Sequence, residues 1–154
     1  MKSGGKEGEQ EMLMGEFQHS IDAKGRLFMP AKLRDTLGTH FVITKGLDKC
    51  LFVYSDEEWE KLQGKFANSP MSKQSVRQVA RFFFGGATDA EPDKQGRVLL
   101  PQNLRIYAEL DKNVVIVGVG TRAEIWDVDA WNDYNAKVSK DVTDIVEQLV
   151  DLGI

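Results

Sequence analysis

Two arginines, each placed directly after a glycine-containing turn, have the clearest binding chemistry in this sequence. Arg26 follows the turn at residues 22–25, and Arg97 follows the turn at residues 93–96. A side chain in this position lies at the rim of a hairpin, where it can meet a flat or grooved partner. The planar guanidinium suits phosphate oxygens and the edge of guanine. We therefore interpret both arginines as candidate binding residues.

The turns also predict a structural role for these arginines. Each turn opens with an aspartate, whose side chain accepts hydrogen bonds from the turn backbone, and closes with a glycine, which adopts positive φ freely. Pairing of each aspartate with the arginine four residues later would fix the turn. The two roles are compatible, because an arginine that is held in place can also bind a ligand. The expected turn-structuring residues are Asp22, Gly25, Asp93 and Gly96.

Other basic residues lie close to both turns. The net charge of −4 disfavours a nucleic-acid partner at first sight, but this charge is unevenly divided. Residues 22–34 carry four basic side chains against one acidic, residues 93–105 three against one, and residues 124–151 two against eight. Screening over about 8–10 Å lets a basic patch attract phosphate locally. The candidate binding set is Lys24, Arg26, Lys94, Arg97, Arg34 and Arg105, of which the last two could equally brace the fold.

The two turns belong to a longer internal repeat. Residues 22–34 and 93–105 share the same amino acid at six positions, each pair 71 residues apart, which indicates a duplication. Beyond a one-residue insertion near Glu109 the offset becomes 72, and Trp59 then aligns with Trp131. The duplication therefore spans a whole structural unit.

Residue patterns predict the elements of this unit. Both tryptophans belong to the predicted core by their helical spacing, and each unit ends in another amphipathic helix, over 76–83 and 142–149. In the first unit we expect strands over 15–21, 26–29, 41–44 and 51–54, a helix over 31–37 and a second helix that begins at the capping box of residues 55–58.

The expected fold class is α+β with a mainly β core. Neither half has enough strands to cover its own sheet, so the halves should pair about a pseudo-two-fold axis into one small barrel with helices outside. The expected segments are a polar leader over 1–11 that is either a native tail or an expression remnant, a first repeat over 16–58, a helical connection over 59–86, a second repeat over 87–130, and C-terminal helices over 131–154.

Several classes of function find no support in the sequence. No apolar run approaches the roughly 20 residues that span a bilayer, so we expect no membrane partner. Cys50 is the single cysteine, and His19 and His40 lack ligands at metal spacing, so no metal or other cofactor is expected. We find no catalytic motif and expect no enzyme, since each candidate aspartate is followed by an arginine that would keep it ionised.

The motifs together resemble one known family. Gly15-Glu-Phe-Gln-His, both Asp-x-x-Gly-Arg turns, Phe82-Phe-Phe-Gly-Gly-Ala and Pro101-Gln-Asn-Leu-Arg are similar to the MraZ proteins over about residues 12–154. This resemblance implies tandem AbrB-like swapped-hairpin repeats and a bacterial, cytoplasmic, nucleoid-associated transcriptional regulator of the division and cell-wall gene cluster, including its own promoter. It also implies a ring-like homo-oligomer that binds short repeats in double-stranded DNA through the candidate binding set.

Two further interpretations stay open. The alternative function is a protein-interaction barrel without DNA binding, in which the acidic C-terminal helices or the duplicated rim engage another protein. The aromatic run at residues 82–84 could form a platform for bases, although packing in the core or between subunits is the favoured explanation. Within the turns, Lys24 corresponds to Gln95, and Lys94 corresponds to Ala23. Strand alternation would turn Lys94 to the other face and make the first turn the stronger binder.

Overall fold

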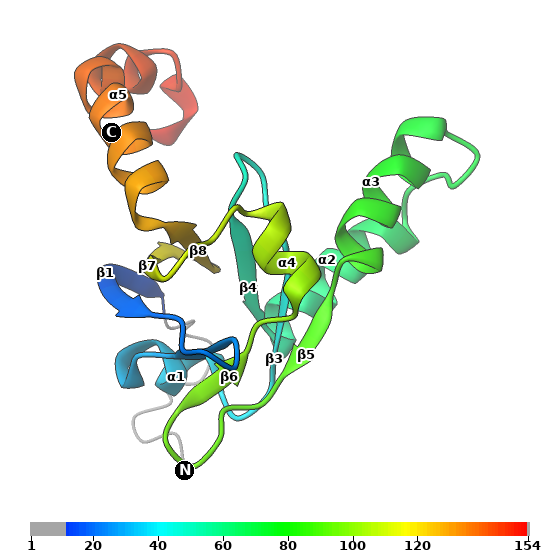
Figure 1. The fold of residues 1–154 in the computed structure, drawn as a ribbon. Coiled ribbons are helices and arrows are strands. Elements are labelled where there is room, and N and C mark those ends of the chain that lie inside the picture. The colour runs from blue at the N-terminus through cyan, green and yellow to red at the C-terminus, as the bar shows by residue number, and fades with distance from the viewer. Residues whose placement is uncertain (1–11, 154) are drawn as a thin grey trace.

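The computed structural model describes residues 12–153, so the expected leader over residues 1–11 lies outside the described residues. Antiparallel strands form most of the body, short helices pack against them, and longer helices extend away from them (Figure 1). The strands are β1 (Leu13–Ser20), β2 (Arg26–Phe28), β3 (Phe41–Lys45), β4 (Leu51–Ser55), β5 (Thr88–Ala90), β6 (Arg97–Leu99), β7 (Asn113–Gly120) and β8 (Ala123–Asp127). The helices are α1 (Ala31–Leu37), α2 (Asp56–Ala67), α3 (Gln74–Gly85), α4 (Gln102–Tyr107), α5 (Val128–Glu147) and the short 3₁₀ helix η1 (Val150–Leu152).

The element order occurs twice, which agrees with the duplication expected from the sequence. β1, β2, α1, β3 and β4 correspond to β5, β6, α4, β7 and β8. The main sheet has the order β1-β7-β8-β4-β3-β5. β1 pairs with β7 and β5 pairs with β3, so the first strand of each repeat pairs with the third strand of the other repeat. β4 and β8 meet in the middle of this sheet. The two halves are therefore interlocked and share one sheet.

The second strands of the two repeats pair with each other. β2 and β6 form a separate two-stranded antiparallel ribbon, in which Arg26 lies opposite Leu99 and Phe28 opposite Arg97. β2 leaves the first hairpin after a single bridge between Ile21 and Leu27. The α+β class with a mainly antiparallel sheet is confirmed. The closed barrel is not confirmed, because the six-stranded sheet ends at β1 and β5 without closing.

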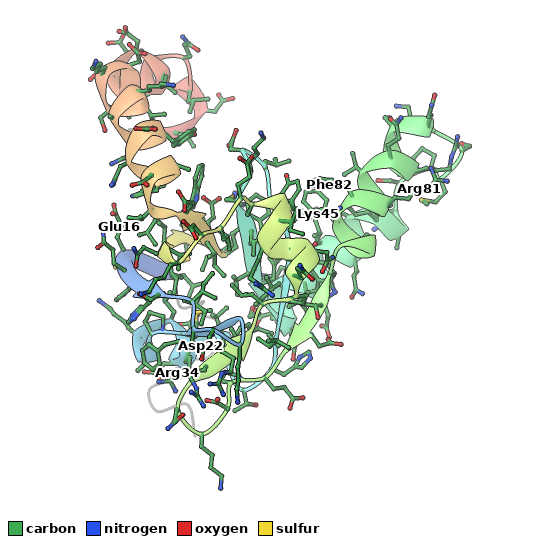
Figure 2. The ribbon with its side chains drawn as sticks, viewed as in Figure 1. Glu16, Asp22, Arg34, Lys45, Arg81 and Phe82 are labelled. Carbon is green, nitrogen blue, oxygen red and sulfur yellow. The ribbon has the colours of Figure 1, made fainter. Side chains whose placement is uncertain are left out.

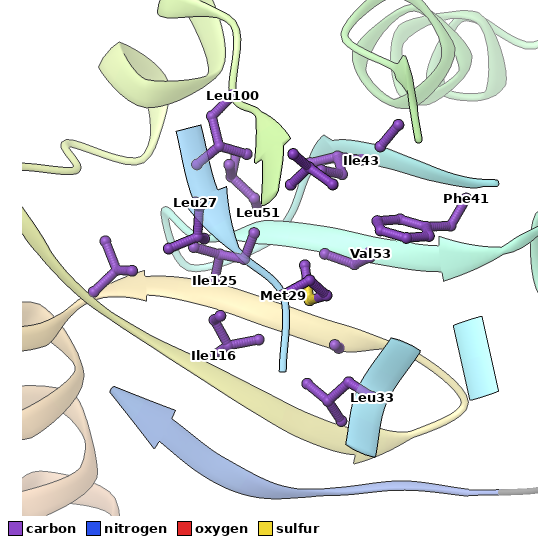
Figure 3. Packing of buried hydrophobic residues seen from close by; sticks show 14 of the residues in the cluster. Leu27, Met29, Leu33, Phe41, Ile43, Leu51, Val53, Leu100, Ile116 and Ile125 are labelled. Atoms are coloured by element: carbon purple, nitrogen blue, oxygen red, sulfur yellow. The ribbon is translucent and has the colours of Figure 1, made fainter. Parts of the chain in front are cut away.

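Both repeats contribute to one main hydrophobic core. The ribbon closes over the large sheet, and buried side chains from both fill the space between them (Figure 3). Burial of each such side chain contributes about 1.5–3 kcal/mol. The largest fully buried members include Leu27, Met29, Leu33, Phe41, Ile43, Leu51, Val53, Leu100, Ile116 and Ile125.

The three longer helices lie outside this core. α2, α3 and α5 contain no buried residue, and they project from the strands as two separate arms (Figure 1). The prediction that Trp59 and Trp131 are core residues holds only in part, since both side chains are half-buried. Trp131 packs against a second buried cluster that contains Trp126, and Trp59 packs on the rings of Tyr54 and Phe84. Helical spacing identified an apolar face correctly but carries no information about what covers that face. No helix among the described residues combines the length and hydropathy needed to cross a membrane.

The helical segments differ between the repeats. In the first half, residues 68–73 separate α2 from α3, and Pro70 lies in this break because proline disrupts a continuing helix. In the second half, residues 128–147 contain neither proline nor glycine, and they form the single helix α5 where we expected two helices. The predicted cap of α2 is present, since Ser55 Oγ accepts a hydrogen bond from the Glu58 N–H at 3.2 Å.

The aromatic run at residues 82–84 packs against the fold. The Phe83 ring stacks on Phe52 at 6.2 Å, and the Phe84 ring meets Trp59 edge to face at 5.2 Å. The Phe82 ring lies 5.7 Å from that of Tyr107. The favoured explanation, packing, is confirmed, and these contacts attach α3 to the sheet and to α4.

A histidine links three elements at one edge of the sheet. His40 Nδ1 lies 2.7 Å from Asp56 Oδ1 at the start of α2, and His40 Nε2 lies 3.0 Å from Asp89 Oδ1 on β5. The hydrogen bond with Asp56 is the main cause that raises the pKa of His40 above its usual value. A protonated imidazole can donate to both carboxylates at once. The ionic link therefore depends on His40 carrying its proton.

We expect this link to make folding stability pH-dependent. The pKa of His40 is raised in the folded state. The contribution of the link to the free energy of unfolding is therefore complete below the unfolded-state pKa of about 6.5, and it is lost as pH rises through the raised folded-state pKa. The free energy of unfolding, measured by denaturant titration across this range, should fall by less than about 1 kcal/mol because the pairs are exposed. His40→Gln should abolish that fall and Asp89→Asn should reduce it; an unchanged pH profile in His40→Gln would contradict the assignment.

Candidate nucleic-acid interface

The first turn is held by its own aspartate. The Gly25 N–H donates to the Asp22 carbonyl oxygen at 2.9 Å, and Asp22 Oδ1 accepts from the backbone N–H groups of Lys24 at 3.0 Å and Arg26 at 2.9 Å. The second turn, residues 93–96, repeats all three hydrogen bonds. Aspartate at the first position and glycine at the fourth are favoured in such turns. The predicted turn-structuring residues thus have the contacts expected of them.

The aspartates also hold the two candidate arginines. Arg26 Nε donates to Asp22 Oδ2 at 2.8 Å, and Arg97 Nε donates to Asp93 Oδ2 at 2.9 Å. Hydrogen bonds from the arginine backbone N–H are the main cause that lowers the pKa of both aspartates, so both carboxylates stay ionised at neutral pH. Among residues 12–153, the structure shows hydrogen bonds from the Nε atoms of these arginines but none from their terminal Nη atoms. Each guanidinium is therefore oriented at Nε and has its outer edge available.

The register of the ribbon puts both arginines on one surface. Residues directly opposite each other in an antiparallel pair share a face, as do residues two apart on one strand. Arg26, Phe28, Arg97 and Leu99 therefore form one face, which we call the outer ribbon face. The intervening residues of both strands are buried in the core. Sequence reasoning missed Phe28 and Leu99 as members of this face, although each lies two residues after a candidate arginine.

Arg34 reaches from α1 to the turn of the other repeat. Its Nε donates to the carbonyl oxygen of Met29 at 2.7 Å, and its guanidinium lies 5.4 Å from the centre of the Phe28 ring. A Cβ atom added to Gly96 would lie only 2.9 Å from Arg34 Cζ. Arg34 therefore packs directly against the second turn, although it belongs to the first repeat.

Arg105 makes the reciprocal contact. Its Nε donates to the carbonyl oxygen of Leu100 at 2.9 Å, and its guanidinium would lie 3.2 Å from a Cβ atom added to Gly25. Each turn thus combines a lysine and an arginine of its own repeat with an arginine from the other. Figure 2 shows Asp22 and Arg34 at the end of the molecule remote from α3 and α5. The bracing role considered for Arg34 and Arg105 is present, and only the fold reveals which turn each one supports.

The lysines require one correction. Lys24 and Lys94 are both exposed, but residues 94 and 95 lie in the turn before β6 begins. Strand alternation does not apply to turn residues, so the argument that Lys94 faces away is wrong. The two repeats differ in which turn position carries the lysine.

Among the described residues, no three histidine, cysteine, aspartate or glutamate side chains gather as a possible metal site.

Comparison with known proteins agrees with the duplicated architecture. The family model described as "MraZ protein, putative antitoxin-like" matches residues 12–82 and again residues 83–152. The chain belongs to the MraZ family. Each match contains one complete set of strand, turn, ribbon strand, short helix and strand pair. The duplicated turns are therefore a feature of tandem MraZ domains in this chain.

Curated relatives are similar over nearly the whole chain. "Transcriptional regulator MraZ" of Desulforamulus reducens is 53% identical over 141 residues, covering 92% of this chain and 99% of the relative. The protein of the same name from Heliobacterium modesticaldum is 52% identical over 143 residues, covering 93% and 100%. That of Syntrophomonas wolfei is 50% identical with the same coverage. The similarity to MraZ proteins thus extends across both repeats and the helices that follow them.

The contact between Arg34 and the second turn predicts a specific sensitivity to substitution. Gly96 has φ of +81°, so Gly96→Ala should cost at least about 1–2 kcal/mol for the left-handed backbone and displace the Arg34 guanidinium as well. Gly64→Ala in α2 is the matched control, because a Cβ there meets nothing within 4 Å and should stabilise the helix by about 0.5–1 kcal/mol. Denaturant titration measures both; equal stability of Gly96→Ala and the parent would refute the packing described for this turn.

Proposed function

We propose that this chain is a transcriptional regulator that binds double-stranded DNA through the outer ribbon face. The observation that carries the proposal is the pair of arginines, each oriented by an aspartate, on one exposed face of a two-stranded ribbon. The major groove of DNA is wide enough to admit such a ribbon, and ribbons read base edges there in other proteins. The names of the relatives support regulation of transcription.

The candidate residues divide into two roles. Arg26 and Arg97 have outer edges suited to the O6 and N7 acceptors of guanine, where a paired contact discriminates between bases. Lys24, Lys94 and the bracing arginines Arg34 and Arg105 supply positive charge near phosphates, which positions the protein without reading sequence. The turns are attached to a well-packed core, so little ordering of the protein is needed for binding.

Assembly into a homo-oligomer completes the proposal. One ribbon makes few contacts, whereas several ribbons on one particle raise the effective concentration at spaced DNA repeats. Exposed apolar side chains support assembly: Val79 on α3, Val142 and Ile145 on α5, and Leu149 just beyond the end of α5 are 39–48% exposed. In such an assembly, α3 of one subunit would contact α5 of the next. This contact is heterologous, since it joins two different surfaces, and it forms a closed ring when the rotation between neighbouring subunits divides a full turn evenly.

The site of action follows from the same proposal. A regulator with these properties acts in the cytoplasm at the nucleoid. Its proposed targets are short repeats upstream of the division and cell-wall gene cluster, including its own promoter, as similarity to the MraZ family suggests. The second candidate function is protein interaction without DNA binding, favoured by the exposed apolar stripe of the acidic helix α5.

DNA binding is tested by fluorescence anisotropy on double-stranded DNA from upstream of the gene, at several salt concentrations. Arg26→Ala and Arg97→Ala should each weaken binding by roughly 5- to 150-fold, the value of a paired guanine contact. Lys24→Ala should lower the slope of log affinity against log salt by about 0.9. Arg81→Ala is the matched control, since Arg81 is an exposed arginine on α3, far from the ribbon (Figure 2).

Two results would separate failure of the site from failure of the function. If both ribbon variants bind like the parent while retaining its stability, DNA contacts a different surface. If the parent shows no retention of DNA even at low salt but forms a stable complex with another protein, the protein-interaction function replaces the regulator.

The assembly is tested by light scattering coupled to size exclusion. Ile145→Glu places a charge on the exposed apolar stripe of α5 and should lower the number of subunits per particle. Lys140→Glu is the control, because a rotation of about 100° per residue puts it on the opposite side of the helix. A monomeric parent, or an Ile145→Glu particle of unchanged mass, would contradict assembly through this stripe.

A further inference from the structure

One apolar side chain stands exposed in the middle of the proposed DNA-binding surface. Leu99 is 60% exposed on the outer ribbon face, directly across the strand pair from Arg26. Its neighbours along β6, Val98 and Leu100, are 1% and 0% exposed and supply the packing of this strand. A leucine is therefore not needed here to hold the ribbon on the core.

The equivalent position in the first repeat is used differently. Phe28 lies 71 residues before Leu99, and its ring is partly covered by its own repeat. The His19 ring meets it at 5.0 Å, and the Arg34 guanidinium lies 5.4 Å from its centre. In the second repeat the position of His19 is taken by Ala90, which has no ring to offer. Leu99 therefore exposes its apolar surface to solvent, whereas the equivalent Phe28 is partly covered.

Major-groove chemistry suggests the partner of this side chain. Thymine differs from the other bases there by its C5 methyl group, and apolar side chains recognise that methyl by contact. Side chains opposite each other in a ribbon have Cβ atoms about 4.5–5.5 Å apart. Successive bases along one strand are about 3.4 Å apart. Arg26 and Leu99 can therefore reach base pairs separated by one or two steps.

We propose that Leu99 contacts the C5 methyl group of a thymine close to the guanine contacted by Arg26, an inference that rests on the proposed DNA binding. The end of the ribbon that carries Arg26 and Leu99 then reads guanine and thymine. The other end, with Arg97 and the covered Phe28, reads guanine alone. A pseudo-symmetric ribbon thereby distinguishes its two ends, and each subunit has one preferred direction on the DNA.

Uracil-containing DNA tests this contact without knowledge of the operator. The upstream fragment is prepared once with thymine and once with uracil at every thymine position, which removes only the methyl groups. The parent protein should bind the uracil fragment about 3- to 5-fold more weakly for each methyl group that Leu99 touches. Leu99→Ala should bind both fragments with nearly equal affinity. For each protein, the affinity for the thymine fragment is divided by the affinity for the uracil fragment. Any effect of uracil on DNA shape changes both quotients equally, so it cancels when the parent is compared with Leu99→Ala.

Two controls complete the design. Leu47→Ala removes a leucine that is 56% exposed outside the ribbon, between β3 and β4, and should keep the preference of the parent for thymine. Leu99→Met keeps an apolar side chain and should retain part of that preference. Both variants and Leu99→Ala are checked for unchanged stability and particle mass.

The outcomes separate this inference from the function on which it rests. If the parent binds neither fragment, the proposed DNA binding fails and the thymine contact fails with it. If the parent binds but prefers thymine no more than Leu99→Ala does, the thymine contact is overturned while DNA binding stands. If Leu99→Ala changes the particle mass, the side chain belongs to an interface between subunits and the inference is likewise overturned.

Discussion

The pairing of β2 with β6 is the constraint on which the rest of the structure depends. The Met29 N–H donates to the Gly96 carbonyl at 2.8 Å, and the Leu100 N–H donates to the Gly25 carbonyl at 2.9 Å, so each turn is bonded to the other repeat. Strands of three residues have little stability alone, and a two-stranded ribbon needs a packed face to persist. The ribbon obtains that face from the shared core, which makes the two repeats interdependent.

The same interdependence shapes the candidate interface. Arg34 and Arg105 each donate a hydrogen bond to a backbone carbonyl of their own repeat, that of Met29 and that of Leu100 respectively. Each guanidinium also packs against the turn of the other repeat. Arg26 is anchored through Nε, which leaves its outer edge for a ligand. Structural and binding roles therefore do not compete for the same atoms. A rigid pair of turns with oriented donors reduces the entropy that binding must overcome.

Much of the local structure could be predicted from the sequence, because local chemistry controls it. Asp22 and Gly25 form the turn predicted for them, and Ser55 caps α2. The errors arise where distant parts of the chain decide the outcome. Trp59 has helical spacing typical of a core residue, yet nothing in a periodic pattern says whether a sheet covers that face. Sheet closure likewise depends on strand curvature over the whole fold, which the residue pattern did not reveal.

The sequence by itself determined that two equivalent turns exist, that each is built by an aspartate and a glycine, and that basic side chains surround them, since all of this depends on residues within a few positions of one another. Only the tertiary structure decided which side chains share a surface. Strand exchange puts Arg34 of the first repeat beside the turn at 93–96, and ribbon pairing puts Leu99 opposite Arg26. These neighbours are about 60–75 residues apart in sequence, and long-range strand pairing is favourable only when the whole core buries its apolar surface together.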